Sequence, residues 1–191
     1  YTVFEDEKGT YILNAKDLCM IDHIDKLAQA GVDSFKIEGR AKSSYYVSVV
    51  TNAYRMAMDI YKQNPENFKL PQWVHDEVFK VSHRAYCTGF FFGHPKDCQY
   101  YENSGYIRDY DVVAVIEECR NGRIYAKQRN KFNKGDVLEV LSPGRKPEEI
   151  TAEAIYNEYD EEVETANHAM MKLSMPCLME FPKNSIIRMR K

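Results

Sequence analysis

The sequence of 191 residues has no apolar run that approaches the roughly 18 to 20 residues needed to cross a bilayer. It also lacks the basic start of a secretory signal peptide, because its first charged residues are Glu5, Asp6 and Glu7. We therefore expect no membrane partner and a cytoplasmic location. The sequence begins at Tyr1 rather than at a methionine, which favours a segment of a longer protein.

An excess of positive charge is absent as well, since the formal net charge is −3. Any binding of nucleic acid must then come from a local patch of cations. The five cysteines are far apart and include no Cys-x-x-Cys pair, so neither a disulfide framework nor a self-contained zinc site is predicted.

Several catalytic signatures are missing too. There is no Gly-x-Ser-x-Gly elbow, no His-Glu-x-x-His zinc helix, no P-loop and no Gly-x-Gly-x-x-Gly turn. The five histidines lack the spacing of metal ligands. We therefore expect this chain alone to hold no cofactor.

Apolar residues repeat with a helical period over residues 18–30 and 46–61. Asp17 is placed to cap the first of these helices, and Gly31 is placed to end it. Pro65 ends the second helix, because proline cannot continue the hydrogen-bonding pattern. The sequence thus predicts two amphipathic helices in its first third.

Residues 1–14 are predicted to form a short two-stranded piece, and residues 32–38 alternate enough for a third strand. The order helix, strand, helix is typical of a parallel sheet, but one parallel strand is not stable alone. We therefore interpret residues 1–64 as the closing portion of a TIM-like β/α barrel in an α/β domain. Residues 65–103 then form a connector, with a short helix near 73–84.

From residue 104 the sequence changes to short strand-like runs separated by turn residues. The strongest turn is Asn121-Gly122, since a type I′ hairpin needs a positive φ at both central positions. The predicted strands are 111–119, 123–128, 136–141, 150–156, 169–174 and 185–190. Residues 104–191 are therefore expected to form an all-β small closed barrel of about six antiparallel strands, since closure removes exposed edges.

Charged residues at the end of the predicted strand 32–38 are the most informative group. Lys36 and Glu38 should point away from the helices, toward the interior of a β/α barrel at its carboxyl end. Charges there must be paired or must engage a ligand. The candidate catalytic residues at this mouth are Lys36, Glu38, Arg40 and Lys42. An ion pair of Glu38 with Lys36 or Arg40 that only closes the barrel is the alternative.

A second group of charges lies in the predicted small barrel. Five cations fall within twelve residues, namely Arg123, Lys127, Arg129, Lys131 and Lys134. Tyr125 and Phe132 are interleaved with them, so cations and stacking rings could meet a nucleic-acid backbone together. The alternative is a solvated hairpin whose cationic edge blocks strand addition. The acidic run 158–164 is predicted to be a solvated loop or edge.

Four blocks of sequence carry a family resemblance. They are 13–19 (Leu-Asn-Ala-Lys-Asp-Leu-Cys), 36–43 (Lys-Ile-Glu-Gly-Arg-Ala-Lys-Ser), 82–90 (Ser-His-Arg-Ala-Tyr-Cys-Thr-Gly-Phe) and 130–136 (Asn-Lys-Phe-Asn-Lys-Gly-Asp). This pattern resembles the C-terminal portion of peptidase family U32, the collagenase-like proteases. The resemblance covers nearly the whole chain and implies an upstream β/α domain in the same protein.

The resemblance also implies cofactors for the full-length protein. Several branches of the family hold a 4Fe–4S iron–sulfur cluster on four cysteines, and Cys19 matches the position of the fourth ligand. The other three ligands are expected upstream, so this segment alone should hold no cluster and should be inactive. One branch, which this sequence resembles most in its barrel and in block 36–43, is associated with hydroxylation of the wobble uridine of tRNA and uses prephenate.

Two functions from different classes follow from the resemblance. The first is tRNA wobble-uridine hydroxylation, an RNA modification, in which the small barrel binds tRNA or another RNA. The plan of this barrel is similar to the second domain of translation elongation factors, which is an analogy of fold alone. The alternative is a collagenase-like protease, in which this segment helps to bind a peptide substrate. A scaffold that only docks partners is a third interpretation.

Overall fold

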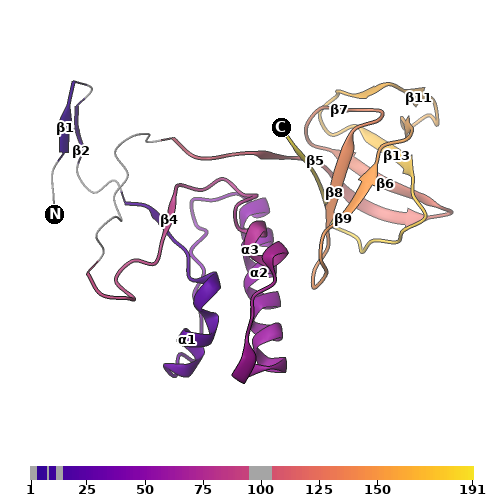
Figure 1. Cartoon of the computed structure of the whole chain (residues 1–191). Coiled ribbons are helices and arrows are strands. Elements are labelled where there is room, and N and C mark those ends of the chain that lie inside the picture. Colours follow the sequence, from indigo (N-terminus) through magenta and orange to yellow (C-terminus); the bar gives the residue numbers. More distant parts are fainter. Residues whose placement is uncertain (1–3, 8, 12–14, 95–104) are drawn as a thin grey trace.

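The computed structural model describes residues 4–7, 9–11, 15–94 and 105–191. The helices gather in one part of the molecule and a strongly curled sheet forms the other, with strand β5 running out from the sheet toward the helices (Figure 1). Within the described residues, no helix is both long and apolar enough to span a membrane. The structure is thus mixed, with few helices and a large antiparallel sheet.

The N-terminal strands are confirmed within the described residues. Strand β1 (Phe4–Asp6) pairs antiparallel with β2 (Gly9–Tyr11), and Phe4 lies opposite Tyr11. The rest of the predicted two-stranded piece, residues 1–3, 8 and 12–14, lies outside the described residues.

The first predicted helix begins later than expected. A 3₁₀ turn η1 (Ile21–His23) leads into α1 (Ile24–Gln29), whose last turn is closed at Gly31 as predicted. Gly31 has a φ of +80°, and Val32 N donates to Leu27 O at 3.2 Å, which satisfies a carbonyl at the helix end. The predicted capping role of Asp17 is wrong.

Asp17 instead belongs to a two-residue strand. Strand β3 (Asp17–Leu18) pairs in parallel with β4 (Tyr86–Cys87). Ladder bonds of the main chain, such as Cys19 N to Cys87 O at 2.9 Å, therefore fix residues 17–19 in an extended form and delay the helix. A partner almost 70 residues away in sequence thus decides this local structure.

The second predicted helix is confirmed. Helix α2 (Ser44–Gln63) begins after Ser43, whose Oγ accepts a hydrogen bond from Tyr46 N at 3.2 Å. Its buried face packs against α1 and against α3 (Gln72–Glu77), which covers only part of the helix expected near 73–84. A 3₁₀ turn η2 (Pro65–Asn67) lies between α2 and α3. The apolar core of this part consists of Ile21, Ile24, Ala53, Ala57, Val74 and Val78.

The predicted strand at 32–38 is wrong. Residues 32–39 carry no helix or strand and form no ladder with any described residue. A strand is stabilised by its neighbours, and the alternation of side chains cannot replace the missing ladder bonds.

The C-terminal part confirms antiparallel strands in all six predicted runs, but the sheet has eight strands. They are β5 (Tyr110–Arg120), β6 (Arg123–Gln128), β8 (Val137–Leu141), β9 (Glu148–Thr151), β10 (Ile155–Tyr156), β11 (Glu162–Val163), β13 (Lys172–Pro176) and β14 (Ile186–Arg190). Their order in the sheet is β11-β10-β13-β6-β5-β14-β8-β9. A separate pair joins β7 (Phe132–Asn133) to β12 (Thr165–Ala166).

The sheet curls but does not close. Strands β9 and β11 are its edges, and no ladder joins them within residues 105–191. The predicted closed barrel is therefore wrong, and the structure is a half-barrel. Both edges are short and carry glutamates, Glu148 and Glu149 in β9 and Glu162 in β11, which discourages pairing with another chain without closure.

The predicted hairpin between β5 and β6 is confirmed, since Asn121 and Gly122 have φ values of +51° and +70°. The half-barrel encloses its own apolar core, which includes Val113, Ile116, Ile124, Phe132, Leu138, Ile155 and Ile187. A smaller apolar cluster of Val49, Val50, Val81 and Leu141 joins the helices to the half-barrel. The two parts therefore share packing.

Candidate active-site pocket

A cavity of about 440 Å³ lies between strands β3 and β4, the irregular segment 34–38 and helix α2. Its polar lining comes from three stretches of the sequence, namely residues 17–19, residues 34–54 and Tyr86. These polar side chains are Asp17, Cys19, Ser34, Lys36, Glu38, Lys42, Tyr46, Tyr54 and Tyr86. Two acids, two cations, a thiol and three phenols thus face one space.

Asp17 organises one side of this pocket. Its carboxylate accepts hydrogen bonds from Arg84 N at 3.0 Å and from Arg84 Nε at 3.1 Å. The same carboxylate lies 3.6 Å from Lys42 Nζ, and both side chains are about four-fifths buried. Lys42 Nζ also donates to Ser82 O at 3.3 Å. One carboxylate therefore holds two cations at the pocket wall, which leaves an excess of positive charge there.

The ammonium group of Lys42 also lies between aromatic rings. Its Nζ is 5.1 Å from the centre of the Tyr46 ring and 4.3 Å from the centre of the Tyr106 ring. Rings at these distances attract a cation and exclude water from it. Lys42 is thus fixed in place as a cation that can meet an anionic ligand.

Cys19 lies beside Tyr54 in the same pocket. Its Sγ is 3.8 Å from Tyr54 OH, and this hydroxyl accepts a hydrogen bond from Met20 N at 2.9 Å. Burial raises the pKa of the Cys19 thiol, and burial together with the nearby Cys19 raises that of Tyr54. Both groups are therefore protonated at neutral pH, and Cys19 is not an activated nucleophile.

The predicted catalytic residues are only partly brought together. Lys36, Glu38 and Lys42 line the pocket, whereas Arg40 is exposed and does not. Glu38 Oε1 accepts a hydrogen bond from the main-chain N of Arg40 at 2.8 Å. Within the described residues Glu38 forms no ion pair with Lys36 or Arg40, so the alternative of a closing ion pair is wrong.

Gly39 is required for space rather than for an unusual φ. A Cβ at this position would lie 2.8 Å from Val47 Cγ2, which is closer than real Cβ atoms approach. Lys42 N donates to Gly39 O at 3.0 Å and closes the turn that leads into α2. The glycine therefore allows the turn that carries Lys42 to pack against the helix.

Blocks 13–19 and 82–90 carry part of the family resemblance, but no local pattern predicted that Tyr54 and Tyr86 line this pocket or that Asp17 pairs with Arg84, because these residues meet only through the tertiary fold. His83, next to Arg84, is buried, stacks on Tyr86 with ring centres 4.4 Å apart, and contacts Arg84 O through Nδ1 at 2.7 Å. It thus supports the wall of the pocket.

The residues of this pocket could hold only part of an iron–sulfur cluster. Cys19 is the one cysteine in the lining, and no three His, Cys, Asp or Glu side chains gather as a metal site among the described residues. Such a cluster takes four cysteine ligands, so this part of the protein fits as the source of one of them.

The predicted cationic patch is only partly free. Arg123, Tyr125 and Lys127 share the outer face of β6, as expected from strand geometry. Arg123 pairs with Asp160 at 2.6 Å, and Lys134 lies 3.7 Å from Glu164 and also pairs with Glu162. The prediction for the acidic run 158–164 is confirmed, because its residues are exposed apart from the half-buried Val163, and Glu162–Val163 form the edge strand β11. From this edge its carboxylates neutralise Arg123 and Lys134.

The other three predicted cations differ in exposure, since Arg129 and Lys131 are exposed and Lys127 is half-buried. Within the described residues, Lys127, Arg129 and Lys131 take part in no ion pair. Lys172, which the sequence did not single out, lies opposite Lys127 in the ladder of β13 and β6. These four cations form what we term the open patch.

The chain is similar in sequence to several known proteins. tRNA hydroxylation protein P1 of Bacillus subtilis is 33% identical over 171 residues, which are 88% of this chain and 40% of that protein. tRNA hydroxylation protein P of Escherichia coli is 39% identical over 146 residues, 74% of this chain and 31% of that protein. A collagenase of Porphyromonas gingivalis is 34% identical over 89 residues, 46% of this chain and 24% of that protein.

The chain thus spans at most 40% of the length of these relatives. Residues 1–100 match peptidase family U32, and residues 108–188 match the C-terminal domain of peptidase family U32. The first match alone covers more than half of the chain and contains the whole pocket. The chain belongs to peptidase family U32.

Proposed function

We propose that this chain is the C-terminal part of a protein that acts in tRNA hydroxylation, and that the pocket of Asp17, Cys19 and Lys42 belongs to its active site. The observation that carries this proposal is the meeting of Lys36, Glu38 and Lys42 with Cys19 in one cavity. The names of the B. subtilis and E. coli relatives support the choice of reaction.

In this proposal, residues 1–64 are the closing portion of a TIM-like β/α barrel whose remainder lies upstream. The parallel pairing of β3 with β4 supports a β/α fold, although β4 lies in the segment 65–103, because parallel ladders belong to such folds. The pocket would then lie at the carboxyl mouth of the barrel, where such folds place their active sites.

Cys19 would supply one thiolate to a 4Fe–4S cluster in the full-length protein, and such a cluster supplies electron transfer or substrate activation when bound. Lys42 would bind a carboxylate, such as one of the two in prephenate, since it is a fixed cation in a partly dry site. The Tyr54 hydroxyl accepts a hydrogen bond from Met20 N and contacts the Cys19 sulfur, and so it would hold the orientation of the thiol. This chain alone would be inactive.

The alternative, a collagenase-like protease, needs an activated nucleophile. The raised pKa of Cys19 does not favour it, because thiol proteases lower the pKa of their cysteine. In the native chain, alkylation of Cys19 by iodoacetamide should follow a pH profile whose midpoint is higher than in the same chain unfolded in urea. Peptide mass spectrometry measures both profiles on the same cysteine. A native midpoint below the unfolded one would support a nucleophilic Cys19.

We further propose that the open patch contacts the RNA backbone, in a half-barrel whose likeness to the second domain of elongation factors stays a prediction. The affinity of the chain for tRNA should fall with salt. The double variant Lys127→Ala/Lys131→Ala should reduce the slope of log Kd against log salt by about 1 to 2, at roughly one unit per lost phosphate contact.

The matched control is Arg123→Ala/Lys134→Ala, which removes the same charge from cations that Asp160 and Glu162 already neutralise. Its slope should change by less than half as much. Binding that does not depend on salt, or an equal change of slope in both variants, would contradict the open patch as an RNA-binding surface.

A further inference from the structure

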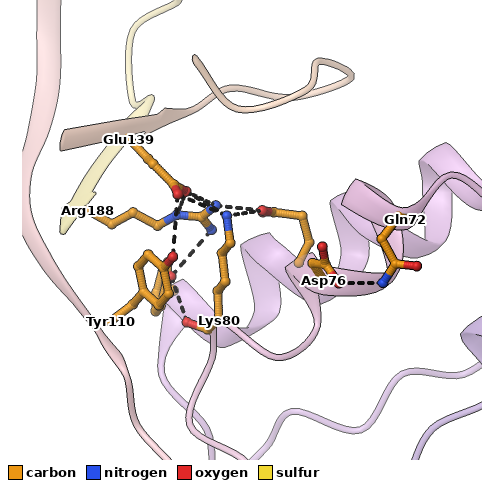
Figure 2. Close-up of polar contacts among 8 residues, drawn as sticks. Gln72, Asp76, Lys80, Tyr110, Glu139 and Arg188 are labelled. Atoms are coloured by element: carbon orange, nitrogen blue, oxygen red, sulfur yellow. Dashed lines mark hydrogen bonds and ion pairs between the residues drawn. The ribbon is translucent and has the colours of Figure 1, made fainter. Parts of the chain in front are cut away.

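A buried cluster of polar side chains joins the half-barrel to the helices (Figure 2). We call it the Arg188 cluster, and its members are Tyr45, Glu77, Lys80, Tyr110, Glu139 and Arg188. The Arg188 side chain is 0% exposed. Its Nε and Nη2 donate to Glu139 Oε2 at 2.9 and 2.6 Å, and its Nη2 also donates to Glu77 Oε1 at 2.6 Å. The guanidinium thus ties β14 and β8 to the end of α3.

Lys80 completes the charge balance of the cluster. Its Nζ donates to the two oxygens of Glu139 at 3.0 and 2.9 Å and lies 3.1 Å from Glu77 Oε1. Two cations and two carboxylates therefore form a neutral, largely dry unit. Buried ion pairs of this kind add little net stability compared with apolar residues, but they demand one geometry. We therefore expect the Arg188 cluster to fix the position of the half-barrel relative to the helices.

Tyr45 links this cluster to the pocket. Its hydroxyl donates to Lys80 O at 2.9 Å and accepts from Arg188 Nη1 at 3.4 Å. Burial raises the pKa of Tyr45 to about 12, so the hydroxyl keeps its proton and donates at all physiological pH values. Tyr45 is the second residue of α2 and lies between Lys42 and Tyr46 in sequence, both of which line the pocket.

The other end of this link also reaches the pocket. Residues 80–84 run from the Arg188 cluster to Ser82, whose main-chain O accepts from Lys42 Nζ at 3.3 Å. Two residues later Arg84 forms its hydrogen bonds to Asp17. The turn before α2 and the segment 80–84 are thus joined twice, once through Tyr45 and once through Lys42.

We propose that Arg188 is a positioning residue for the pocket, because it holds Tyr45 and Lys80 in the arrangement that brings Lys42 and Arg84 to Asp17. The half-barrel is then an integral part of the active site and not only a module that binds RNA. This inference rests on the proposed function for the activity of the pocket. The structural coupling between the Arg188 cluster and the pocket does not depend on that function.

Hydrogen exchange of the full-length protein tests the coupling without any substrate. Tyr45→Phe removes the hydroxyl and keeps the ring, and it should speed exchange of the amides of residues 42–47 by about three- to tenfold, as expected for one lost hydrogen bond. Tyr110→Phe is the matched control, since its hydroxyl reaches Glu139 at 3.5 Å within the same cluster but does not contact residues 80–84. It should change these rates by less than twofold.

Two outcomes would overturn the inference. One is equal exchange of residues 42–47 in both variants. The other is an exchange rate at the core amides of β6 that rises in Tyr45→Phe as much as the rate at residues 42–47, which would show general loosening of the fold. As a second measurement, Tyr45→Phe should lower kcat for tRNA about tenfold and leave KM within about twofold, because positioning acts on the reacting geometry. If neither variant nor wild type modifies tRNA, the proposed function fails while the exchange data still decide the coupling.

Discussion

Replacing Arg188 by Met should lower the free energy of unfolding by about 3 to 5 kcal/mol, the cost of leaving buried charges without a partner. Glu77 is 3% exposed, and its Oε2 has no partner among the described residues, so the carboxylate depends on Arg188 and Lys80. Urea unfolding of the full chain, followed by circular dichroism, measures the difference.

The matched control is Arg55→Met, which breaks the exposed pair of Arg55 with Asp59 on α2. This change should leave the free energy of unfolding close to that of wild type, because an exposed ion pair adds little net stability. Equal costs for the two variants would contradict the view that the Arg188 cluster fixes the join between the helices and the half-barrel.

The difference in the free energy of unfolding between wild type and Arg188→Met should also depend on pH. Burial opposes ionisation of Glu139, but hydrogen bonds from Lys80 and the charge of Arg188 outweigh it and lower its pKa below the ordinary value of 4.5. A lowered pKa contributes stability that is complete above the unfolded pKa and is lost as the pH falls through the folded one. The difference should therefore narrow below about pH 4.

The second large effect is expected for Lys42. Lys42→Met keeps most of the aliphatic stem that packs between Tyr46 and Tyr106 but removes the charge, and it should lower kcat/KM for tRNA hydroxylation by the full-length protein about 100-fold. This is the loss that follows when one fixed charge at a reacting group is removed. Steady-state assays with purified tRNA and mass spectrometry of the product measure it.

Lys62→Met, on the exposed end of α2, is the matched control and should keep wild-type activity. Lys42→Arg should recover part of the loss, because it restores the cation beside Asp17. If Lys42→Met turns over tRNA as fast as wild type at both low and saturating substrate, the cation is structural and the pocket has been assigned wrongly.

The helices and the hairpins were predictable because their signals are local. The apolar period of α2, the serine that caps it and the proline after it all lie within one segment, as do Asn121 and Gly122 of the β5–β6 turn. The failures have the opposite cause. Residues 32–38 need a neighbouring strand, and residues 17–18 take their structure from a partner at 86–87.

The candidate site was predictable to a similar degree. Lys36, Glu38 and Lys42 could be found because they cluster in sequence, and the structure places them around one cavity. Arg40 belongs to the same cluster in sequence, but the turn at Gly39 leaves it outside the lining. The contacts of Tyr54 with Cys19 and of Arg84 with Asp17 join residues 35 and 67 positions apart, which no local pattern reveals.

The cationic patch shows the same limit. Its five predicted members lie within twelve residues of sequence. Arg123 and Lys134 are nevertheless neutralised by the acidic run near residue 160, and Lys172 of another strand lies beside Lys127. The density of cations along the sequence therefore included two cations that are neutralised and missed one that is not.

The most direct test of the central claim is the state of tRNA in cells. Mass spectrometry of tRNA from a strain that lacks the full-length protein should show the hydroxylated wobble uridine missing. The wild-type gene should restore it, and genes with Lys42→Met or Cys19→Ser should not, although both proteins accumulate. Unchanged hydroxylation in the deletion strain, together with gelatin cleavage that the purified protein performs and Cys19→Ser leaves intact, would contradict the account and favour the protease.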